Sequence, residues 1–377
     1  MRQGKPTMTD IARQARVSKN TVSLALRHDP QIPAGTRRRI AQIARKLGYQ
    51  KNPTVAHLMA QLRVSRSPAS QPLLALVNAN LDREAFLRHP TIPVYVEGCR
   101  RRAHELGYLL DEFWLHEPEL NGGRFNKIIR ARNIRGLVIV GLMNENRLPA
   151  RFLPTWQSHP CVVTGVRTRD PALSFACTDH HILTIKAFEQ ALHLGYKRPA
   201  LVLDKEIDQL VDGRFTAGML IAQQQIPASR RATPFYFVNQ AKRNPDLFHR
   251  WFAKEKPDLI LTLYHNVQEW LREAGYKSGK EIGLIQLDRR HGRPEWSGMD
   301  QHSDIIGASA VEMLIGMIHN NESGIPSYPR ATLIGSTWVE GKTTLRSAPF
   351  WNGRKRPLGP ACQTIALLYE RGFFQLC

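Results

Sequence analysis

Acidic residues are almost absent from the first 66 positions of this chain. Asp10 and Asp29 stand there against 14 Lys and Arg residues, a difference of +12 within a total net charge of +21. Such a density of positive charge attracts a polyanion, and the affinity falls with salt as counterions are released. Because the charges are interleaved with apolar residues at helical spacing, the segment is expected to fold and to bind nucleic acid.

Long hydrophobic runs and paired cysteines are also missing. No stretch of about 18 apolar residues exists, and residues 1–6 lead into polar sequence, so we expect neither a spanning helix nor a secretory signal. The five cysteines are scattered without a CxxC pair, so we expect reduced thiols in the cytoplasm and no metal site. The GxSxG and HExxH motifs are absent, so we expect no enzyme and no cofactor.

Capping and apolar residues in the first fifty positions predict three short helices. Thr7 and Asp10 have the spacing of a capping box, and they open a helix that ends near position 15. Ser18 is placed to cap a second helix over 21–26, and Pro33 precedes a third. The third helix has apolar residues at i, i+3, i+4 and i+7 and a glycine just after its end: Ile40, Ile43, Ala44, Leu47 and Gly48. This order predicts a helix-turn-helix head over 1–51.

The head resembles the DNA-binding head of the lactose-repressor (LacI/GalR) family of bacterial transcriptional regulators. The matching motifs are Thr9-Asp10-Ile11-Ala12, Ala15, Val17-Ser18-Lys19-Asn20-Thr21-Val22-Ser23, Thr36-Arg37 and Leu47-Gly48-Tyr49. In that family the second helix enters the major groove, which implies that Lys19 and Asn20 read base edges, whereas Thr21, Ser23 and Arg37 hold phosphates. The resemblance implies DNA contacts for Thr9, Ser18, Lys19, Asn20, Thr21, Ser23, Leu24, Arg37, Tyr49, Asn52 and Leu58.

Two positions depart from the family pattern. Arg16 stands in the turn where the family commonly has Gly, and a positive φ there would cost on the order of 1 kcal/mol. Leu24 stands where the family commonly has Arg, so it offers a thymine methyl only apolar contact or lies at the edge of the core. The operator sequence is therefore open, while DNA binding is expected.

Residues 52–72 are expected to form a hinge and linker. The amphipathic part, 52–62, is too short to be a stable helix alone. The resemblance implies a hinge helix that folds on DNA and places Leu58 as a wedge between base steps of the minor groove. An ordinary interdomain linker helix, with Leu58 packed on its own body, is the alternative.

The body, residues 73–346, alternates short apolar runs with amphipathic stretches, a pattern typical of parallel sheets built from βαβ units. Strands are expected at 73–77, 109–114, 137–140, 161–164, 200–203, 259–263 and 282–287. Helices are expected at about 94–106, 121–132, 180–194, 211–225, 246–255 and 265–274. A recurring signature, Leu-Gly-Tyr at 47–49, 106–108 and 194–196 and Ala-Gly-Tyr at 274–276, is interpreted as helix-terminating punctuation.

The body resembles the effector domain of the same family, which is similar to periplasmic sugar-binding proteins. The resemblance implies two doubly wound lobes: about 73–195 with a helix near 303–321, and about 196–300 with a final strand near 331–339. It also implies a homodimer, with the helix at 94–106 as a dimer face. The tail, 347–377, lies beyond the resemblance.

Ligands of open α/β sheets bind beyond the carboxyl ends of the strands. That rule selects Asn78 and Asn80 after the first strand, and it selects Asp179, Arg214 and Asp288 further along the chain. By resemblance, Asp179, Arg214 and Asp288 match positions that line the effector cleft. For each of these residues a helix cap or a surface salt bridge is the alternative.

The sequence thus predicts an α/β protein with an all-α helix-turn-helix head, a hinge helix and a two-lobed, periplasmic-binding-protein-like body. The expected function is that of a cytoplasmic, homodimeric transcriptional regulator, most simply a repressor. It would bind a pseudo-palindromic DNA operator and respond to a small-molecule effector, with a carbohydrate as the family-level expectation, and would have no membrane partner. The alternative is a solute-binding protein with the same body and no DNA role.

Overall fold

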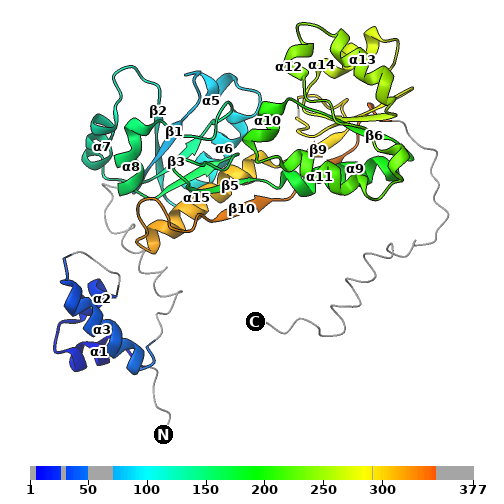
Figure 1. Cartoon of the computed structure of the whole chain (residues 1–377). Coiled ribbons are helices and arrows are strands. Elements are labelled where there is room, and N and C mark those ends of the chain that lie inside the picture. The colour runs from blue at the N-terminus through cyan, green and yellow to red at the C-terminus, as the bar shows by residue number, and fades with distance from the viewer. Residues whose placement is uncertain (1–5, 27–30, 50–70, 291, 345–377) are drawn as a thin grey trace, which may run out of the picture.

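The computed structural model describes residues 6–26, 31–49, 71–290 and 292–344, shown in colour in Figure 1. The expected hinge and linker at 52–72 lies outside the described residues as far as position 70, and this part includes Asn52 and Leu58. The tail at 347–377 lies outside them as well.

The head is a bundle of three helices around a small apolar core. Its helices are α1 (Met8–Ala15), α2 (Lys19–Ala25) and α3 (Ala34–Lys46). Ile11, Val22 and Ile40, one from each helix, are fully buried in the shared core. The predicted three-helix order is therefore confirmed.

The first lobe is built on a six-stranded sheet in the order β10-β5-β4-β3-β1-β2, with all paired neighbours parallel. The strands are β1 (Leu73–Asn78), β2 (Leu109–Trp114), β3 (Ile134–Val140), β4 (Cys161–Thr164), β5 (Ser174–Thr178) and β10 (Ala331–Ile334). Successive side chains of β1 face opposite sides, so Leu74 and Leu76 pack with one helical layer and Ala75 and Val77 with the other.

Helices cover both faces of this sheet. One layer holds α5 (Ala85–Arg88), α6 (Ile92–Glu105) and α15 (Ser303–His319). The other holds α7 (Gly122–Ala131), the 3₁₀ turn Ala150–Phe152 and α8 (Leu153–Ser158). The predicted return of a helix near 303–321 to the first lobe is confirmed by the packing of α15 against α6.

The second lobe has a five-stranded sheet in the order β11-β9-β8-β7-β6. Its strands are β6 (Pro199–Val202), β7 (Leu259–Thr262), β8 (Gly283–Gln286), β9 (Gly298–Asp300) and β11 (Thr337–Val339), the last antiparallel to β9. One face carries α9 (His180–His193) and α11 (Arg214–Gln223), and the other carries α12 (Val238–Ala241), α13 (Asp246–Glu255) and α14 (Asn266–Glu273). The short elements α10 (Lys205–Leu210) and the 3₁₀ turn Ala228–Arg230 complete the lobe.

Two lobe assignments made from the sequence were wrong. Helix α9 packs on α11 and so belongs to the second lobe, not the first. The single final strand expected near 331–339 is two strands, because β10 pairs with β5 of the first sheet and β11 pairs with β9 of the second. Strands β5 and β9 were not predicted.

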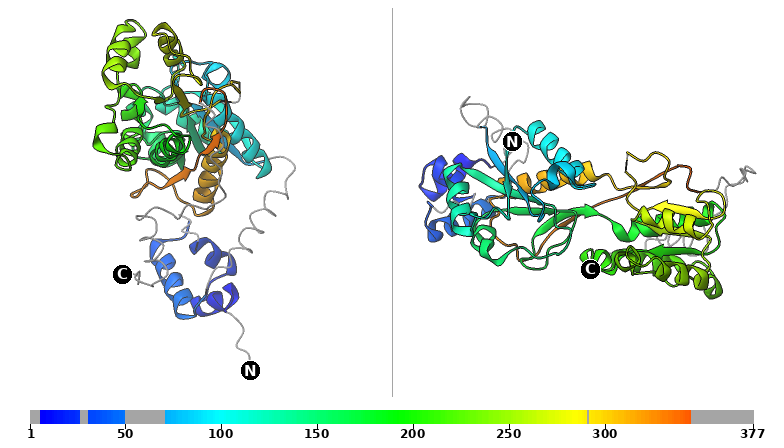
Figure 2. Two further views of the ribbon diagram at one scale, coloured as in Figure 1. Left: turned by 90° about the vertical axis from the view of Figure 1, so that its right-hand side faces the viewer. Right: turned by 90° about the horizontal axis from the view of Figure 1, so that it is seen from above.

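The chain consequently passes between the lobes at three places in the described part: between β5 and α9, between β9 and α15, and between β10 and β11. Figure 2 shows the two lobes end to end with these connections between them. At the last crossing, Lys186 donates to the Ser336 carbonyl at 3.4 Å. The short connections permit a hinge motion between two rigid sheets.

The repeated Gly-Tyr signature ends four helices in the same way. Gly48, Gly107, Gly195 and Gly275 all have positive φ angles. In each case the N–H of the following tyrosine reaches back to a carbonyl of the last turn, as in the bond from Tyr49 to Ala44 at 2.9 Å. These are Schellman caps, so the predicted role as punctuation is confirmed.

Candidate functional site

The turn of the head is held in a left-handed conformation at Arg16. This residue has φ 50° and ψ 47°, the region that a side chain with a Cβ adopts at a cost of roughly 1–2 kcal/mol. Upstream, the Asp10 carboxylate accepts hydrogen bonds from the N–H and the hydroxyl of Thr7, at 2.9 and 2.7 Å. The predicted capping box therefore forms, and the predicted departure at the turn is a real backbone strain.

The start of α2 presents its side chains to solvent. The hydroxyl of Ser18 accepts the N–H of Thr21 at 3.0 Å and lies 2.8 Å from the Thr21 hydroxyl, so Ser18 is the N-cap as predicted. Lys19 and Asn20 follow it and are exposed. A side chain at the first positions of a recognition helix reaches a base edge only if it is exposed in this way.

The other predicted DNA contacts of the head divide by burial. Thr9 is exposed, whereas Ser23, Leu24 and Arg37 are half-buried. Leu24 does not pack against the head core among the described residues, which favours a surface role over a core-edge role. Tyr49 packs partly on that core and closes the last cap, so it also has a structural role.

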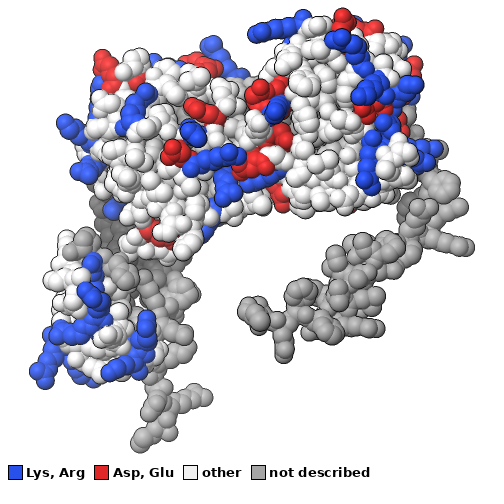
Figure 3. Space-filling model, viewed as in Figure 1, with Lys and Arg blue, Asp and Glu red and all other residues white. Residues whose placement is uncertain are grey.

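Charge distinguishes the head from the body. In the face shown in Figure 3, the charged side chains visible on the head are Lys and Arg, whereas both signs are interspersed over the body. A surface of this kind binds the phosphate backbone of a nucleic acid without regard to sequence. The exposed polar side chains of α2 are of the kind that can contact base edges and so distinguish sequences.

The carboxyl end of β1 is braced internally. The Asn78 amide donates to the carbonyls of Asp82 and Arg83 at 3.2 and 3.1 Å, and its oxygen accepts the N–H of Asn80 at 2.9 Å. Asn80 in turn donates to the Gly141 carbonyl at 3.0 Å, which ties the ends of β1 and β3 together at the switch point of the sheet. With only 3% of its surface exposed, Asn78 serves the turn.

Two of the other predicted residues lie near one another at the β5–α9 crossing. Asp179 caps α9 by accepting the Ile182 N–H at 3.2 Å. Arg214 lies at the start of α11, 5.7 Å over the ring of Phe175, and donates to the Cys177 sulfur at 3.4 Å. Burial raises the pKa of Cys177 to about 11, although the Arg214 charge opposes this. The thiol is therefore inert and the guanidinium is positioned at the lobe boundary.

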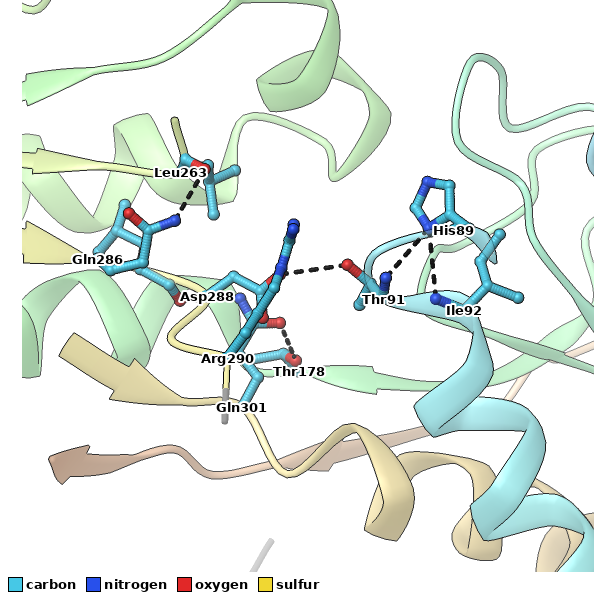
Figure 4. Close-up of polar contacts among 10 residues, drawn as sticks. His89, Thr91, Ile92, Thr178, Leu263, Gln286, Asp288, Arg290 and Gln301 are labelled. Atoms are coloured by element: carbon cyan, nitrogen blue, oxygen red, sulfur yellow. Dashed lines mark hydrogen bonds and ion pairs between the residues drawn. The ribbon is translucent and has the colours of Figure 1, made fainter. Parts of the chain in front are cut away.

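Asp288 follows β8 and faces the first lobe. Its carboxylate accepts the Thr91 hydroxyl at 3.3 Å, and the Arg290 guanidinium lies 3.4 Å from the same oxygen (Figure 4). Burial raises the pKa of Asp288, and these two partners oppose that rise. The Asp288 carboxylate also raises the pKa of the buried Tyr95, beyond the larger effect of burial itself.

A second set of residues, most of them polar, lines a cleft of about 520 Å³ between the lobes. These residues were not predicted from the sequence. The first lobe contributes Asn144, Glu145, Asn146 and Arg169, and the second contributes Glu206, Gln209, Leu210, Asp212 and Gly213. Most of these residues lie in loops or in a one-turn helix, where no periodicity marks them. Only their positions after β3, β4 and β6 gave a signal that could have found them.

The cleft is crossed by an ion pair. Arg169 of the first lobe donates to the Asp212 carboxylate at 2.7 Å, and Arg214 lies 3.9 Å from the other oxygen of that carboxylate. Nearby, burial and a hydrogen bond to Glu206 raise the pKa of Asp204 to about 6. The second lobe therefore presents a cluster of carboxyl groups in which some charge is already paired.

The described residues contain no group of three or more His, Cys, Asp or Glu side chains placed to hold a metal ion. No helix among them is both long and apolar enough to cross a membrane. The sequence Gly341-Lys342-Thr343-Thr344, which superficially resembles a phosphate loop, is instead structural, because Thr343 is buried and donates to the Leu284 carbonyl at 2.8 Å.

Comparison with known proteins identifies relatives of both parts. The family model described as "Bacterial regulatory proteins, lacI family" matches residues 7–52. The HTH-type transcriptional regulator MalR of Streptococcus pneumoniae is 21% identical over 321 residues, which cover 84% of this chain and 94% of MalR.

Solved structures share the fold. A transcriptional regulator CelR–cellobiose complex superposes with a TM-score of 0.53 at 15% identity, covering 90% of this chain and 99% of that one. The lac repressor dimer bound to operator and the anti-inducer ONPF gives a TM-score of 0.52 at 18% identity, covering 91% and 100%. The predicted two-lobed architecture behind a helix-turn-helix head is thereby confirmed.

Proposed function

We propose that this chain, which belongs to the lacI family of bacterial regulatory proteins and is a DNA-binding transcriptional regulator, acts as a repressor whose operator affinity is changed by a small-molecule effector. The observation that carries the proposal is the joining of a basic head, in which α2 begins with exposed Lys19 and Asn20, to a two-lobed body with a polar cleft. We assign it no catalytic step and place its action in the cytoplasm. The proposed division is a head at 1–51, a hinge at 52–72, a body at 73–346 and a tail at 347–377.

DNA recognition is assigned to the start of α2. A lysine can donate to guanine O6 and N7, and an asparagine can pair bidentately with adenine. The half-buried Ser23 and Arg37, with Thr9 and Thr21, are proposed to hold phosphates and so to fix the register of α2 in the groove. A homodimer would present two such helices to a pseudo-palindromic operator.

Effector control is assigned to the cleft between the lobes. Asp179, Arg214 and Asp288 are the proposed contacts, and the residues of the 520 Å³ cleft extend them. A ligand that binds both lobes favours one relative orientation, and three connections transmit that choice to the dimer. The CelR–cellobiose complex, which shares the fold, supports a carbohydrate-like effector.

The proposal is tested by selection of operator sequences. The purified full chain is mixed with a random duplex library at low salt, and the bound fraction is sequenced and footprinted. Enrichment of one pseudo-palindromic sequence, with protection of both half-sites, is the expected result. A bound fraction with no enriched sequence contradicts the regulator assignment.

A truncated chain separates this function from that of a solute-binding protein. Deletion of residues 1–66 is expected to abolish operator binding and to leave effector binding by the body unchanged. If the full chain itself binds small molecules but shows no operator at any salt concentration, the solute-binding alternative holds.

A further inference from the structure

The polar groups around the start of α6 and the loop after β8 are unequally divided between donors and acceptors. His89 and Thr91 lie on the first lobe, and Asp288 and Arg290 lie opposite them on the second (Figure 4). The single hydrogen bond recorded between the lobes here joins Thr91 to Asp288 among the described residues. The polar atoms that are not used in this hydrogen bond determine which ligand can bind here.

The imidazole of His89 is fixed as a donor toward the gap. Its Nδ1 atom accepts the backbone N–H groups of Thr91 and Ile92 at 3.2 and 3.3 Å, and so caps the start of α6. An Nδ1 atom that accepts carries no hydrogen, so the neutral ring has its hydrogen on Nε2. No partner for that Nε2–H is recorded within the described part of the chain.

Arg290 places a positive charge in the same gap. Its guanidinium is one-third exposed and extends between the lobes (Figure 4). Burial, and then the Arg290 charge, lower the pKa of His89, while Asp288 and Asp82 oppose this. Burial, with the charges of Arg293 and Arg290, lowers the pKa of His265 on the second lobe to about 4. The Arg290 charge therefore acts on an imidazole of each lobe.

The carboxylates that face this gap already accept hydrogen bonds. Asp288 accepts from Thr91 and pairs with Arg290, and Asp82 accepts the Glu84 N–H at 2.9 Å. The groups left for a ligand are thus the remaining guanidinium N–H groups and the His89 Nε2–H. Since these protein groups are all donors, the ligand must supply hydrogen-bond acceptors. A compact anion offers the most acceptor atoms in a small volume.

We propose that this gap is an anion site, and that the effector is a polyhydroxy compound bearing a phosphate or carboxylate held by Arg290 and His89. The inference rests on the proposed function, because it names the chemical class of the effector. Bound between the lobes, the anionic group links α6 to the loop after β8 and stabilises the arrangement in which Thr91 meets Asp288. A neutral sugar lacks this link.

Matched probes test the site in the full-length protein. Binding of glucose, gluconate, glucose 6-phosphate and inorganic phosphate is measured by calorimetry and by thermal shift in the wild type, Arg290→Gln and Arg290→Lys. Arg250→Gln, on the exposed surface of α13, removes the same charge elsewhere and is the control. We expect one or both anion classes to bind the wild type, and Arg290→Gln to weaken that binding about tenfold or more. Arg290→Lys should lose less, and the control should not change.

Each pattern of probe binding either identifies a ligand class or contradicts the anion site. Phosphate-bearing probes that bind alone identify a phosphorylated effector, and gluconate alone identifies a sugar acid. If all four probes give the same response in the wild type and in Arg290→Gln, including no response, the anion site is wrong. Operator selection is measured separately, so a discrete operator together with this result rejects the anion site and leaves the proposed function intact.

Discussion

Thr91 and Asp288 are 197 positions apart in the chain, on opposite lobes, and are joined by a hydrogen bond of 3.3 Å. Other polar links between the lobes in the described residues are the Arg169–Asp212 ion pair and the hydrogen bond from Arg214 to the Cys177 sulfur. The Thr91 hydroxyl donates to a carboxylate that is one of the proposed effector contacts. The contact therefore joins the two lobes directly at that proposed site.

Removal of this hydroxyl should favour the open lobes. Thr91→Val keeps the shape of the side chain and loses a hydrogen bond whose net worth is about 1 kcal/mol. We expect a larger radius of gyration in small-angle scattering without effector, and an unchanged one in Thr91→Ser, which keeps the hydroxyl. Equal values for all three proteins would show that the bond does not contribute to closure.

Arg16 gives a prediction in which stability and DNA affinity change in opposite directions. Its positive φ is relieved by glycine, so Arg16→Gly should stabilise the head by about 0.5–1 kcal/mol after the entropy of the unfolded glycine is counted. If the side chain also contacts a phosphate, the same variant should bind the operator more weakly and lower the salt slope by about 1.

Arg16→Lys is the matched control, because it keeps both the charge and the strain. It should leave the stability of the head and the salt slope near those of the wild type. Amide hydrogen exchange of α1 and α2 measures the stability, and filter binding over a salt series measures the slope. A glycine variant that is less stable than the wild type would contradict the argument from strain.

The head could be predicted almost entirely from the sequence because its signals are local. The capping pair Thr7 and Asp10, the cap at Ser18 and the glycine at 48 each act within a few positions, and each has the predicted contact. The short apolar runs that form β1, β3 and β4 are local signals as well. Their bounds are off by three residues at most.

The features that could not be predicted depend on residues that are far apart in the sequence. β5, Ser-Phe-Ala-Cys-Thr, has small and mixed side chains with no alternation, and it becomes a strand because β4 and β10 lie on both sides of it. The division of 331–339 between two sheets, and the meeting of Thr91 with Asp288, likewise depend on tertiary packing. No window of sequence contains both partners of such a contact.

The base-reading assignment predicts position-specific effects on the operator. Lys19→Ala and Asn20→Ala should each cost about 1–3 kcal/mol against the preferred base at one position of each half-site and relax the sequence preference there. Arg13→Ala, an exposed basic residue of α1, should instead weaken binding to all sequences by a similar factor. Selection of operators with each variant, followed by sequencing, measures this. A uniform loss for Lys19→Ala would reassign that residue to a phosphate.

His180 links the core of the second lobe to acid stability. The ring is buried against Phe215, with centroids 4.8 Å apart, and no partner for Nδ1 is recorded among the described residues. Burial, with a smaller effect of the Arg214 charge, lowers the pKa of His180 to about 3. Above pH 6.5 the ring is neutral in both states and the pH has no effect through it. Below that value the unfolded chain binds a proton that the folded chain does not, so stability falls as the pH falls toward 3.

Between pH 7 and pH 5, this group should lower the free energy of unfolding by about 2 kcal/mol. The interval includes about 1.5 pH units below the unfolded pKa, and each unit contributes about 1.36 kcal/mol. His180→Leu removes the group, so its melting temperature should decrease less than that of the wild type between these two pH values. His193→Gln, an exposed histidine of the same helix, should retain the full wild-type decrease. Because His89, His159 and His265 also have lowered pKa values, His180→Leu should keep part of the acid sensitivity. If the decrease in His180→Leu equals that of the wild type, the buried ring does not set the acid stability of this lobe.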